Sequence, residues 1–421
     1  MITVVKFGGT SIENENRIRL AAKNLKKLVA SGRQVVAVVS AQGNTTNKLV
    51  QKLSKVSKNQ SRSKSYFEFL ATGEKMSAHL LAMALNELGQ PAEAITQESE
   101  KFPLLSALQA TDEGETGAGK TNELKRFMID EDTTRSRMKK YIRPLLDSSC
   151  VPVVAGFFIK DSDGNLVSLG RGGSDVTAFL LGKYLNCDEV IIVTDVTGVF
   201  SSDPREVNKP RILGKISAED LALLARTGAQ ILHPNALRFK SGSYEAKIVH
   251  FKDLGKVENT GTKINGAVNT RIQAYKGELT LFTFTGKRIS EKVGLFAKIA
   301  DWFAVRNLSI HSLSTGDDFV SIYIHGAKID GLYKELHTEF IEKRKLFTGL
   351  TKVENVGEVK VSNHIFVESP GIISLISENL FKEGINIIEM VTAHTDIVVY
   401  VSKNLVDKSV SVLRKKFLSA T

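Results

Sequence analysis

The sequence predicts an α/β protein in which a mainly parallel sheet is sandwiched by helices and is followed by two smaller α+β modules. Over residues 1–271, apolar runs of strand length alternate with longer segments of helical periodicity, as in parallel sheets covered on both faces. Beyond Arg271 a shorter strand–helix–strand–strand pattern occurs twice. A chain of 421 residues is too long for one ordinary core, so two or three domains are expected.

The elements of the first region follow from local patterns. Strands are expected at the apolar runs 2–7, 35–40, 151–157, 190–194 and 247–251. Helical periodicity predicts helices at 14–30, 66–88, 134–146, 174–185 and 217–226. The last of these helices begins with a capping pattern from Ser217 to Asp220, and the polar segment 161–165 predicts a hairpin turn.

Two glycine-rich turns indicate that the first region binds phosphate. Lys6-Phe7-Gly8-Gly9-Thr10-Ser11 follows the first strand, and Gly170-Arg171-Gly172-Gly173-Ser174-Asp175 opens a helix. Paired glycines let the backbone approach an anion, the hydroxyl groups donate hydrogen bonds, and the positive end of a helix dipole favours negative charge. Because each turn carries its own cation, the pair suits a site that holds two anionic substrates side by side.

A third segment ends the strand at 190–194 with Thr194-Asp195 and continues through Gly198-Val199-Phe200 to Ser202-Asp203-Pro204-Arg205. The three segments together resemble the aspartate kinase family, which has the amino acid kinase fold and makes aspartyl phosphate from aspartate and ATP. The resemblance covers essentially the whole chain, because further matching segments occur in the family's order. These segments are residues 39–41 with Thr46-Asn47, residues 73–77 and residues 228–234.

The resemblance implies a role for each matched residue. Lys6 would be the principal catalytic residue, which bridges the transferring phosphoryl group, and Asp175 would orient Lys6 or cap its helix. Arg171 matches the arginine that holds the α-carboxylate of aspartate by a bidentate fork, and Glu74 matches the acceptor of its ammonium group. Hydroxyl groups near aspartate are expected at Ser40, Thr46 and Ser174. The expected ATP-binding residues are Lys6, Phe7, Gly8, Gly9, Thr194, Asp195, Phe200, Arg205, Gln230 and Ile231.

Mg²⁺ is expected to accompany ATP, although no carboxylate cluster in the sequence specifies a metal cage. Two positions depart from the family pattern. Phe200 stands where a tyrosine is often found, which keeps ring stacking but removes a hydroxyl contact. Gln230 stands where the family usually has a lysine, and a neutral amide cannot balance phosphate charge as an ammonium group does.

The repeat beyond Arg271 predicts two similar modules. Strand, helix, strand and strand are expected at 279–284, up to 306, at 309–313 and at 320–324, and then again at 365–367, up to 382, at 385–388 and at 397–401. This repeat resembles two ACT modules, ferredoxin-like units that bind amino acids in regulated biosynthetic enzymes. The expected domains are a kinase domain at 1–271 and ACT modules at 278–355 and 356–421. In the family one ACT module is inserted into the other, so the resemblance implies that the two modules can interleave.

The resemblance also implies feedback regulation by lysine or threonine, through a homodimer or a dimer of dimers. A histidine at 311, where lysine-sensing sites often carry an aspartate, leaves the ligand open. Lysine is favoured, because Asp317 or Asp318 could supply the missing charge. The expected effector residues are Lys292, Gly294, Phe296, Ile310 and His311, with Thr315 and Gly316 from a partner chain.

Several alternatives need to be weighed. The segment 114–121 matches the spelling of a P-loop, but it follows the polar residues 110–113 rather than a buried strand, which argues against a P-loop NTPase. A sibling kinase acting on acetylglutamate or a nucleoside monophosphate would usually lack the ACT pair. A noncatalytic amino acid sensor would be expected to have lost Lys6, Arg171 or Asp175.

Composition excludes other classes. The net charge of +11 and the basic stretch 48–64 suggest nucleic-acid binding. However, the pattern of that stretch indicates a solvated amphipathic helix, and it has no aromatic residues on which bases could stack. No apolar run approaches the length of a membrane span, and the N-terminus begins with a strand, so a soluble cytoplasmic protein is expected. Cys150 and Cys187 lack metal-binding spacing and predict buried thiols rather than a disulfide framework.

Overall fold

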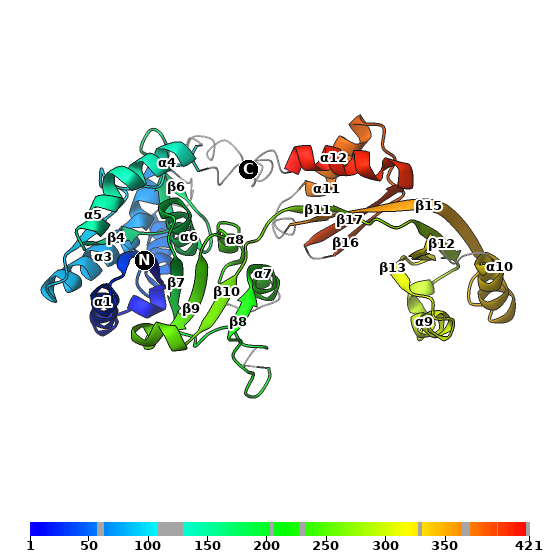
Figure 1. The fold of residues 1–421 in the computed structure, drawn as a ribbon, viewed down its shortest axis with the longest axis horizontal. Helices are drawn as coiled ribbons and strands as arrows, with labels where there is room; N and C mark the ends of the chain where they lie inside the picture. The colour runs from blue at the N-terminus through cyan, green and yellow to red at the C-terminus, as the bar shows by residue number, and fades with distance from the viewer. Residues whose placement is uncertain are drawn as a thin grey trace. The chain divides into compact units, whose positions relative to one another are not determined.

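The computed structural model describes residues 1–56, 63–107, 129–202, 206–226, 232–326, 331–363, 371–393 and 395–417. The chain forms two compact units, Met1–Asn269 and Thr270–Thr421, and each unit has a large sheet of its own (Figure 1). The two units are described separately below.

The first unit is built on an eight-stranded sheet with the order β3-β4-β2-β1-β7-β9-β10-β8. All neighbouring strands in it are parallel except β9 and β10, which are antiparallel. The strands are β1 (Ile2–Phe7), β2 (Gln34–Val39), β3 (Ala92–Ile95), β4 (Val151–Ala155), β7 (Glu189–Thr194), β8 (Lys215–Ser217), β9 (Glu245–His250) and β10 (Thr262–Asn265). A separate hairpin, β5 (Phe158–Lys160) with β6 (Leu166–Ser168), confirms the turn predicted at 161–165.

Helices cover both faces of this sheet (Figure 1). Val5 and Phe7 of β1 pack in one hydrophobic cluster with α1 and α3, whereas Ile2 and Val4 pack on the opposite face with α6. Burial on both faces explains why the strands read as continuous apolar runs. The helices are α1 (Glu15–Ala30), α2 (Thr45–Val56), α3 (Lys64–Glu87), α4 (Glu131–Arg137), α5 (Arg143–Asp147), α6 (Gly173–Leu185), α7 (Ala218–Arg226) and α8 (Pro234–Leu237), with a π-helical turn, η3 (Met138–Ile142), between α4 and α5, and 3-10 turns at η1 (Gly9–Ile12) and η4 (Leu254–Asn259).

The second unit contains a sheet with the order β13-β14-β12-β15-β17-β16, and β11 pairs with β15 beside this path. The first part of the long strand β15 pairs with β12, and its second part pairs with β17 and β11. The strands are β11 (Arg271–Ala274), β12 (Leu279–Thr285), β13 (Ile310–Thr315), β14 (Phe319–His325), β15 (Gly349–Ser362), β16 (Glu389–Ala393) and β17 (Asp396–Ser402). The helices are α9 (Leu295–Val305), α10 (Leu332–His337), α11 (Ile372–Lys382) and α12 (Val406–Phe417), with short turns η5 (Ile289–Glu291), η7 (Thr338–Lys343) and η8 (Lys403–Leu405).

These pairings give two interleaved modules. The first runs from β12 through α9, β13, β14 and α10 to the first part of β15, which is the ferredoxin-like order. The second uses the rest of β15, α11, β16, β17 and α12, and takes its last strand, β11, from the chain before the first module. The predicted fold class, a mainly parallel α/β sheet followed by two α+β modules, is confirmed.

One predicted strand is wrong. Residues 385–388 are not a strand, and β16 begins only at Glu389. Gly384 has a φ of 68° and ends α11, and the Ile385 N–H donates to the carbonyl of Leu380 within that helix end. Ile385 is therefore a buried residue of a helix C-cap, where its apolar side chain packs without strand pairing. The strand predicted at 365–367 lies outside the described residues. Among the described helices, none is long and apolar enough to cross a membrane.

Candidate active site

The two glycine-rich turns meet at the carboxyl edge of the first sheet. Lys6, the next-to-last residue of β1, lies with its Nζ 2.5 Å from Oδ1 of Asp175 in the first turn of α6. Both residues are only 8% exposed. The buried ion pair thus joins two segments that are far apart in the sequence and places a cation between the two turns.

The first turn is packed tightly between β7 and the loop after β2. The Gly8 N–H and the Ser11 hydroxyl both donate to the carbonyl of Val193, at 3.1 Å each. A Cβ on Gly9 would lie 2.6 Å from the carbonyl oxygen of Ala41, so only glycine fits there. The Phe7 side chain is buried in the core, and therefore only its backbone faces the turn.

The second turn shapes the start of α6. Gly170 and Gly172 have φ values of 71° and 74°, in the left-handed region that glycine adopts without strain. Ser174 is buried against Gly156. A Cβ on residue 156 would lie 2.9 Å from the Ser174 Oγ, so the glycine leaves room for the serine. Arg171 is exposed, so its guanidinium is available to a ligand above the turn.

Glu74 lies beside the first turn without full hydrogen bonding. It comes from α3, is 3% exposed, and its Oε1 accepts a hydrogen bond of 3.3 Å from the Ala41 N–H. Its Oε2 is buried and has no hydrogen-bond partner within the described part of the chain. Burial disfavours the carboxylate and raises the pKa of Glu74 to about 7. A buried carboxyl oxygen without a donor is expected where a ligand supplies the donor.

The other predicted residues differ in how closely they approach this centre. Ser40 directly follows β2 and donates its N–H to the Phe7 carbonyl at 3.2 Å, and Thr46 lies in the first turn of α2. Thr194 ends β7, next to β1, and its hydroxyl donates to Asp195 at 3.2 Å. Phe200 forms an isolated bridge with Ile212. Arg205, Gln230, Ile231 and the P-loop-like segment 114–121 lie outside the described residues.

Two residues near the site were not predicted from the sequence. Phe157 has a φ of 73°, which costs energy for a residue with a large side chain, and its N–H donates to the Thr177 hydroxyl of α6 at 3.2 Å. Buried Gln97 donates its side-chain amide to the carbonyls of Ala155 and Phe158, at 3.1 Å each. Together they hold the loop that follows β4 against α6. The glycine at 156, directly after a buried strand, is a sequence signal for such a loop.

The predicted effector residues lie in the first module of the second unit. Gly294 caps α9 with a φ of 75°, and Phe296 is 41% exposed on that helix. Lys292 donates to the Leu346 carbonyl at 2.6 Å, and Thr315 ends β13 with its hydroxyl 3.3 Å from the Phe319 carbonyl. The Gly316 N–H also donates to Phe319, at 3.0 Å.

Ile310 and His311, at the start of β13, contact the rest of the sheet differently. Ile310 packs against the hydrophobic core of the first module. His311 Nε2 lies 2.6 Å from Glu358 Oε2, and its ring lies at a tilt of 44° against Tyr275, with 4.7 Å between the ring centroids. Asp317 and Asp318, considered as charge donors, hold the loop at 288–290 by accepting from the Ser290 hydroxyl at 3.1 Å and the Arg288 N–H at 3.2 Å.

Comparison with known proteins agrees with this arrangement. The sequence model of the amino acid kinase family matches residues 1–250. The aspartokinase of Geobacillus stearothermophilus is 32% identical over 396 residues, which cover 92% of this chain and 89% of that protein.

Two solved structures resemble the fold. Aspartate kinase from Synechocystis gives a TM-score of 0.72 at 23% identity, and the match covers 99% of this chain and 69% of that one. E. coli aspartokinase III, solved in complex with aspartate and ADP, gives a TM-score of 0.51 at 21% identity, covering 99% of this chain and 100% of that one. Because the sequence identities are 23% and 21%, these two structural matches support the fold alone. With the family match and the sequence relative, the chain belongs to the amino acid kinase family and, within it, to the aspartokinases.

Proposed function

We propose that the carboxyl edge of the first sheet transfers the γ-phosphoryl group of ATP to the side-chain carboxylate of L-aspartate and forms 4-phospho-L-aspartate. The observation that carries this proposal is the buried Lys6 between two glycine turns, each suited to an anionic group. The relative from E. coli, which was solved with aspartate and ADP, supports the same pair of ligands.

The reaction brings two negatively charged groups together. A carboxylate oxygen of aspartate attacks the γ-phosphorus, the bond from that phosphorus to the β–γ bridging oxygen breaks, and ADP leaves with the electron pair. The nucleophile is already ionised and no proton needs to be removed from it. The protein must therefore mainly align the reactants and neutralise their charge. Lys6 does this through its ammonium group, which Asp175 holds in place.

The amino acid is held at its other end by two groups of opposite charge. Exposed Arg171 offers a fork of donors to the α-carboxylate. Glu74, whose Oε2 has no hydrogen-bond partner among the described residues, accepts from the α-ammonium. Ser40, Thr46 and Ser174 are hydroxyl donors on the loops and helices around this position.

ATP lies along the first turn and the end of β7. The backbone of residues 7–9, the side chains of Thr194 and Asp195, and Phe200 form the described part of this region. Arg205, Gln230 and Ile231, which lie outside the described residues, belong to the proposed nucleotide site as well. Mg²⁺ would enter with the nucleotide, because it usually takes most of its ligands from phosphates and water and needs only one or two carboxylates. Asp195, an exposed carboxylate at the same edge, fits that role.

Trapping of the product tests the assignment. The full chain is incubated with ATP, Mg²⁺ and one amino acid or carboxylate at a time, and hydroxylamine converts any acyl phosphate to a hydroxamate. Hydroxamate formation with L-aspartate and not with acetylglutamate or glutamate is expected. ATP consumption with acetylglutamate or a nucleoside monophosphate instead would favour a sibling kinase of the same fold. Absence of turnover with every substrate would favour a sensor.

Regulation is proposed to act through the two modules of the second unit, in a homodimer or a dimer of dimers that works in the cytoplasm. Each module is small and presents sheet edges, which association between chains would cover. Lysine is preferred to threonine as the effector, with binding at the start of α9 and at β13, completed by Thr315 and Gly316 of a second copy.

Titration of lysine, threonine and methionine against activity of the full chain tests this regulation. Lysine is expected to inhibit. Phe296→Ala should weaken the inhibition at least about fivefold, because it removes packing of about 1 kcal/mol or more at the effector site. Val305→Ala, an 83% exposed position at the far end of the same helix, is the matched control. No response to any of the three amino acids would exclude the regulatory role without affecting the kinase assignment.

A further inference from the structure

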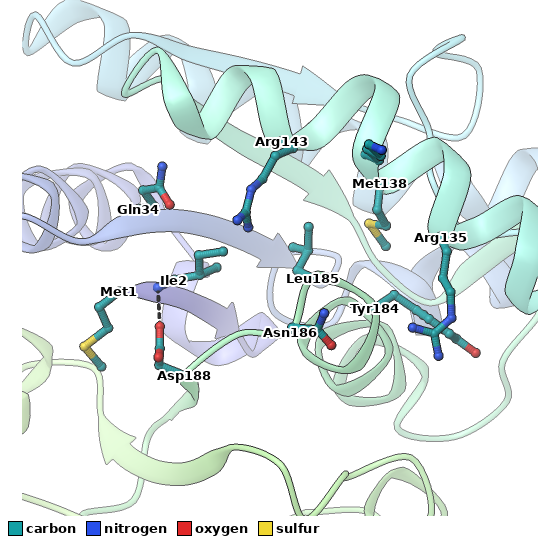
Figure 2. Close-up of a pocket in the computed structure, with 11 residues that line it drawn as sticks. Met1, Ile2, Gln34, Arg135, Met138, Arg143, Tyr184, Leu185, Asn186 and Asp188 are labelled. Atoms are coloured by element: carbon teal, nitrogen blue, oxygen red, sulfur yellow. Dashed lines mark hydrogen bonds between the residues drawn. The ribbon is translucent and has the colours of Figure 1, made fainter.

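A cavity of about 580 Å³ lies at the amino-terminal edge of the first sheet. It opens between the start of β1 and β2, the end of α6 and the helical segment from α4 to α5 (Figure 2). Its volume is within the range of small-molecule sites. It is lined by Met1, Ile2, Gln34, Arg135, Met138, Lys139, Arg143, Tyr184, Leu185, Asn186 and Asp188.

Three basic residues line one wall of this cavity, and all three come from the α4–α5 segment. Arg135, Lys139 and Arg143 are spaced four residues apart, and the π-helical turn at Met138–Ile142 lies between the first and the last of them. Four residues make less than one turn of a π-helix and slightly more than one turn of an α-helix, so the wider turn helps to keep the three side chains on one face. In Figure 2 the Arg143 guanidinium points from its helix toward the side of the cavity where Ile2 and Leu185 lie.

Two of these cations are available to a ligand. Arg135 lies 3.5 Å from Glu131 and over the Tyr184 ring, 5.2 Å from its centroid. The side chains of Lys139 and Arg143, by contrast, form no hydrogen bond or ion pair with any other residue that the structure describes.

Asp188 is the one carboxylate among the described residues that line the cavity. Asp188 Oδ2 accepts from the Ile2 N–H at 2.6 Å (Figure 2), and Asp147 accepts from the Gln34 amide at 3.1 Å. These neutral donors leave the carboxylates charged, but Arg135, Lys139 and Arg143 outnumber Asp188 among the lining residues. The lining is therefore positive overall, and a small anion is the ligand that would balance it.

The floor of the cavity is apolar. Ile2, Met138, Tyr184 and Leu185 are between 2% and 6% exposed, and their side chains belong to the hydrophobic cluster on this face of the sheet. A ligand in contact with both the floor and the basic wall needs an apolar part and a charged part. We propose that this cavity binds a small organic anion, in which a phosphate or carboxylate group is attached to an apolar body.

This site is separate from the kinase site. β1 starts at the cavity with Ile2 and ends at Phe7 beside the first glycine turn, and α6 begins at the second glycine turn and ends at the cavity with Leu185. The 13 residues of α6 span about 20 Å at the usual rise of an α-helix. A ligand in the cavity therefore does not compete with nucleotide or aspartate.

Binding of phenyl phosphate to the full chain tests the proposal. The measurement uses isothermal titration at low ionic strength, with ADP and L-aspartate present in saturating amounts so that the proposed kinase site is filled. Saturable binding is expected. The double variant Lys139→Ala/Arg143→Ala should weaken it at least about tenfold, the factor that a loss of about 1.4 kcal/mol of binding free energy gives. Lys140→Ala, an exposed neighbour that does not line the cavity, should leave the affinity within about twofold.

Further probes separate the parts of the site. Benzoate replaces the phosphate by a carboxylate and shows which anionic group the cavity prefers. Inorganic phosphate lacks the apolar body and benzamide lacks the charge, so each should bind more weakly than phenyl phosphate. Equal affinity for wild type and the double variant, equal binding of inorganic phosphate, or no saturable binding would overturn the proposal. Because the readout is binding rather than turnover, a failure here is distinct from a failure of the kinase assignment.

Discussion

Replacement of Glu74 by glutamine should make the protein more stable and a poorer aspartate kinase at the same time. Burial raises the pKa of this carboxyl from 4.5 to about 7, a difference that corresponds to about 3 kcal/mol. The folded state therefore holds the proton more tightly than the unfolded state does. The stability that this group contributes is fully present below pH 4.5 and is lost as the pH rises through 7.

The magnitude follows from this linkage. At pH 8 the wild-type protein has a buried carboxylate, whereas Glu74→Gln has a neutral side chain of the same shape. The variant should gain up to about 3 kcal/mol in free energy of unfolding at pH 8. Most of this gain should disappear at pH 5, where wild-type Glu74 is itself protonated. Urea unfolding at the two pH values measures the difference. Glu68→Gln, on the same helix but partly exposed and paired with Lys75, is the control.

The kinetic effect should have the opposite sign. Loss of a charged hydrogen bond to the substrate ammonium, worth about 1.5–3 kcal/mol, should raise the KM for aspartate roughly tenfold to a hundredfold. In the wild type, kcat/KM should fall about tenfold for each pH unit below 7, and this dependence should be absent in the variant. Equal stability of both proteins at pH 8 would refute the burial argument. A wild-type kcat/KM that stays flat between pH 6 and 8 would refute the proposed role of Glu74.

Three other changes test separate parts of the structure. Lys6→Ala should lower kcat by about two to four orders of magnitude with little change in aspartate binding, because its charge matters most in the transition state; a variant that keeps a tenth of wild-type turnover in steady-state assays would remove Lys6 from the mechanism. Arg171→Lys should raise the KM for aspartate about tenfold, since an ammonium group cannot form the bidentate fork, and an unchanged KM would show that the α-carboxylate lies elsewhere. Lys240 is 2% exposed and donates to the carbonyls of Ser241, Tyr244 and Gly266 at 2.9, 3.1 and 2.6 Å. Burial lowers the pKa of Lys240 to about 8, so the cost of burying its charge offsets part of what these bonds contribute. Lys240→Met leaves the three carbonyls without this donor and should cost about 1–3 kcal/mol in urea unfolding, whereas unchanged stability would mean that water replaces the donor.

The sequence alone determined much of the first unit. Its strands are buried on both faces, so each strand has an unbroken apolar sequence. This pattern predicted the bounds of β1 and β7 to within one residue. The glycine turns were also visible, because glycine adopts a φ of 74° without strain and because a Cβ at Gly172 or Gly9 would lie 2.5 Å from His233 Cβ or 2.6 Å from the Ala41 carbonyl oxygen. Such local signals depend on a few neighbouring residues, and these the sequence displays directly.

Tertiary structure decided what depends on residues far apart in the chain. No local pattern shows that Oε2 of Glu74 lacks a donor, or that Gln97 supports the loop after β4, because both properties arise from packing between distant elements. The same holds for the second unit, where β11 pairs with the end of β15 and so joins a module that lies further along the sequence. Ile385 has the apolar side chain of a strand residue, yet the helix end before it uses its N–H and buries it as a cap. The hydrogen-bond partner of each backbone and carboxyl group is therefore fixed only by the packing of the whole chain.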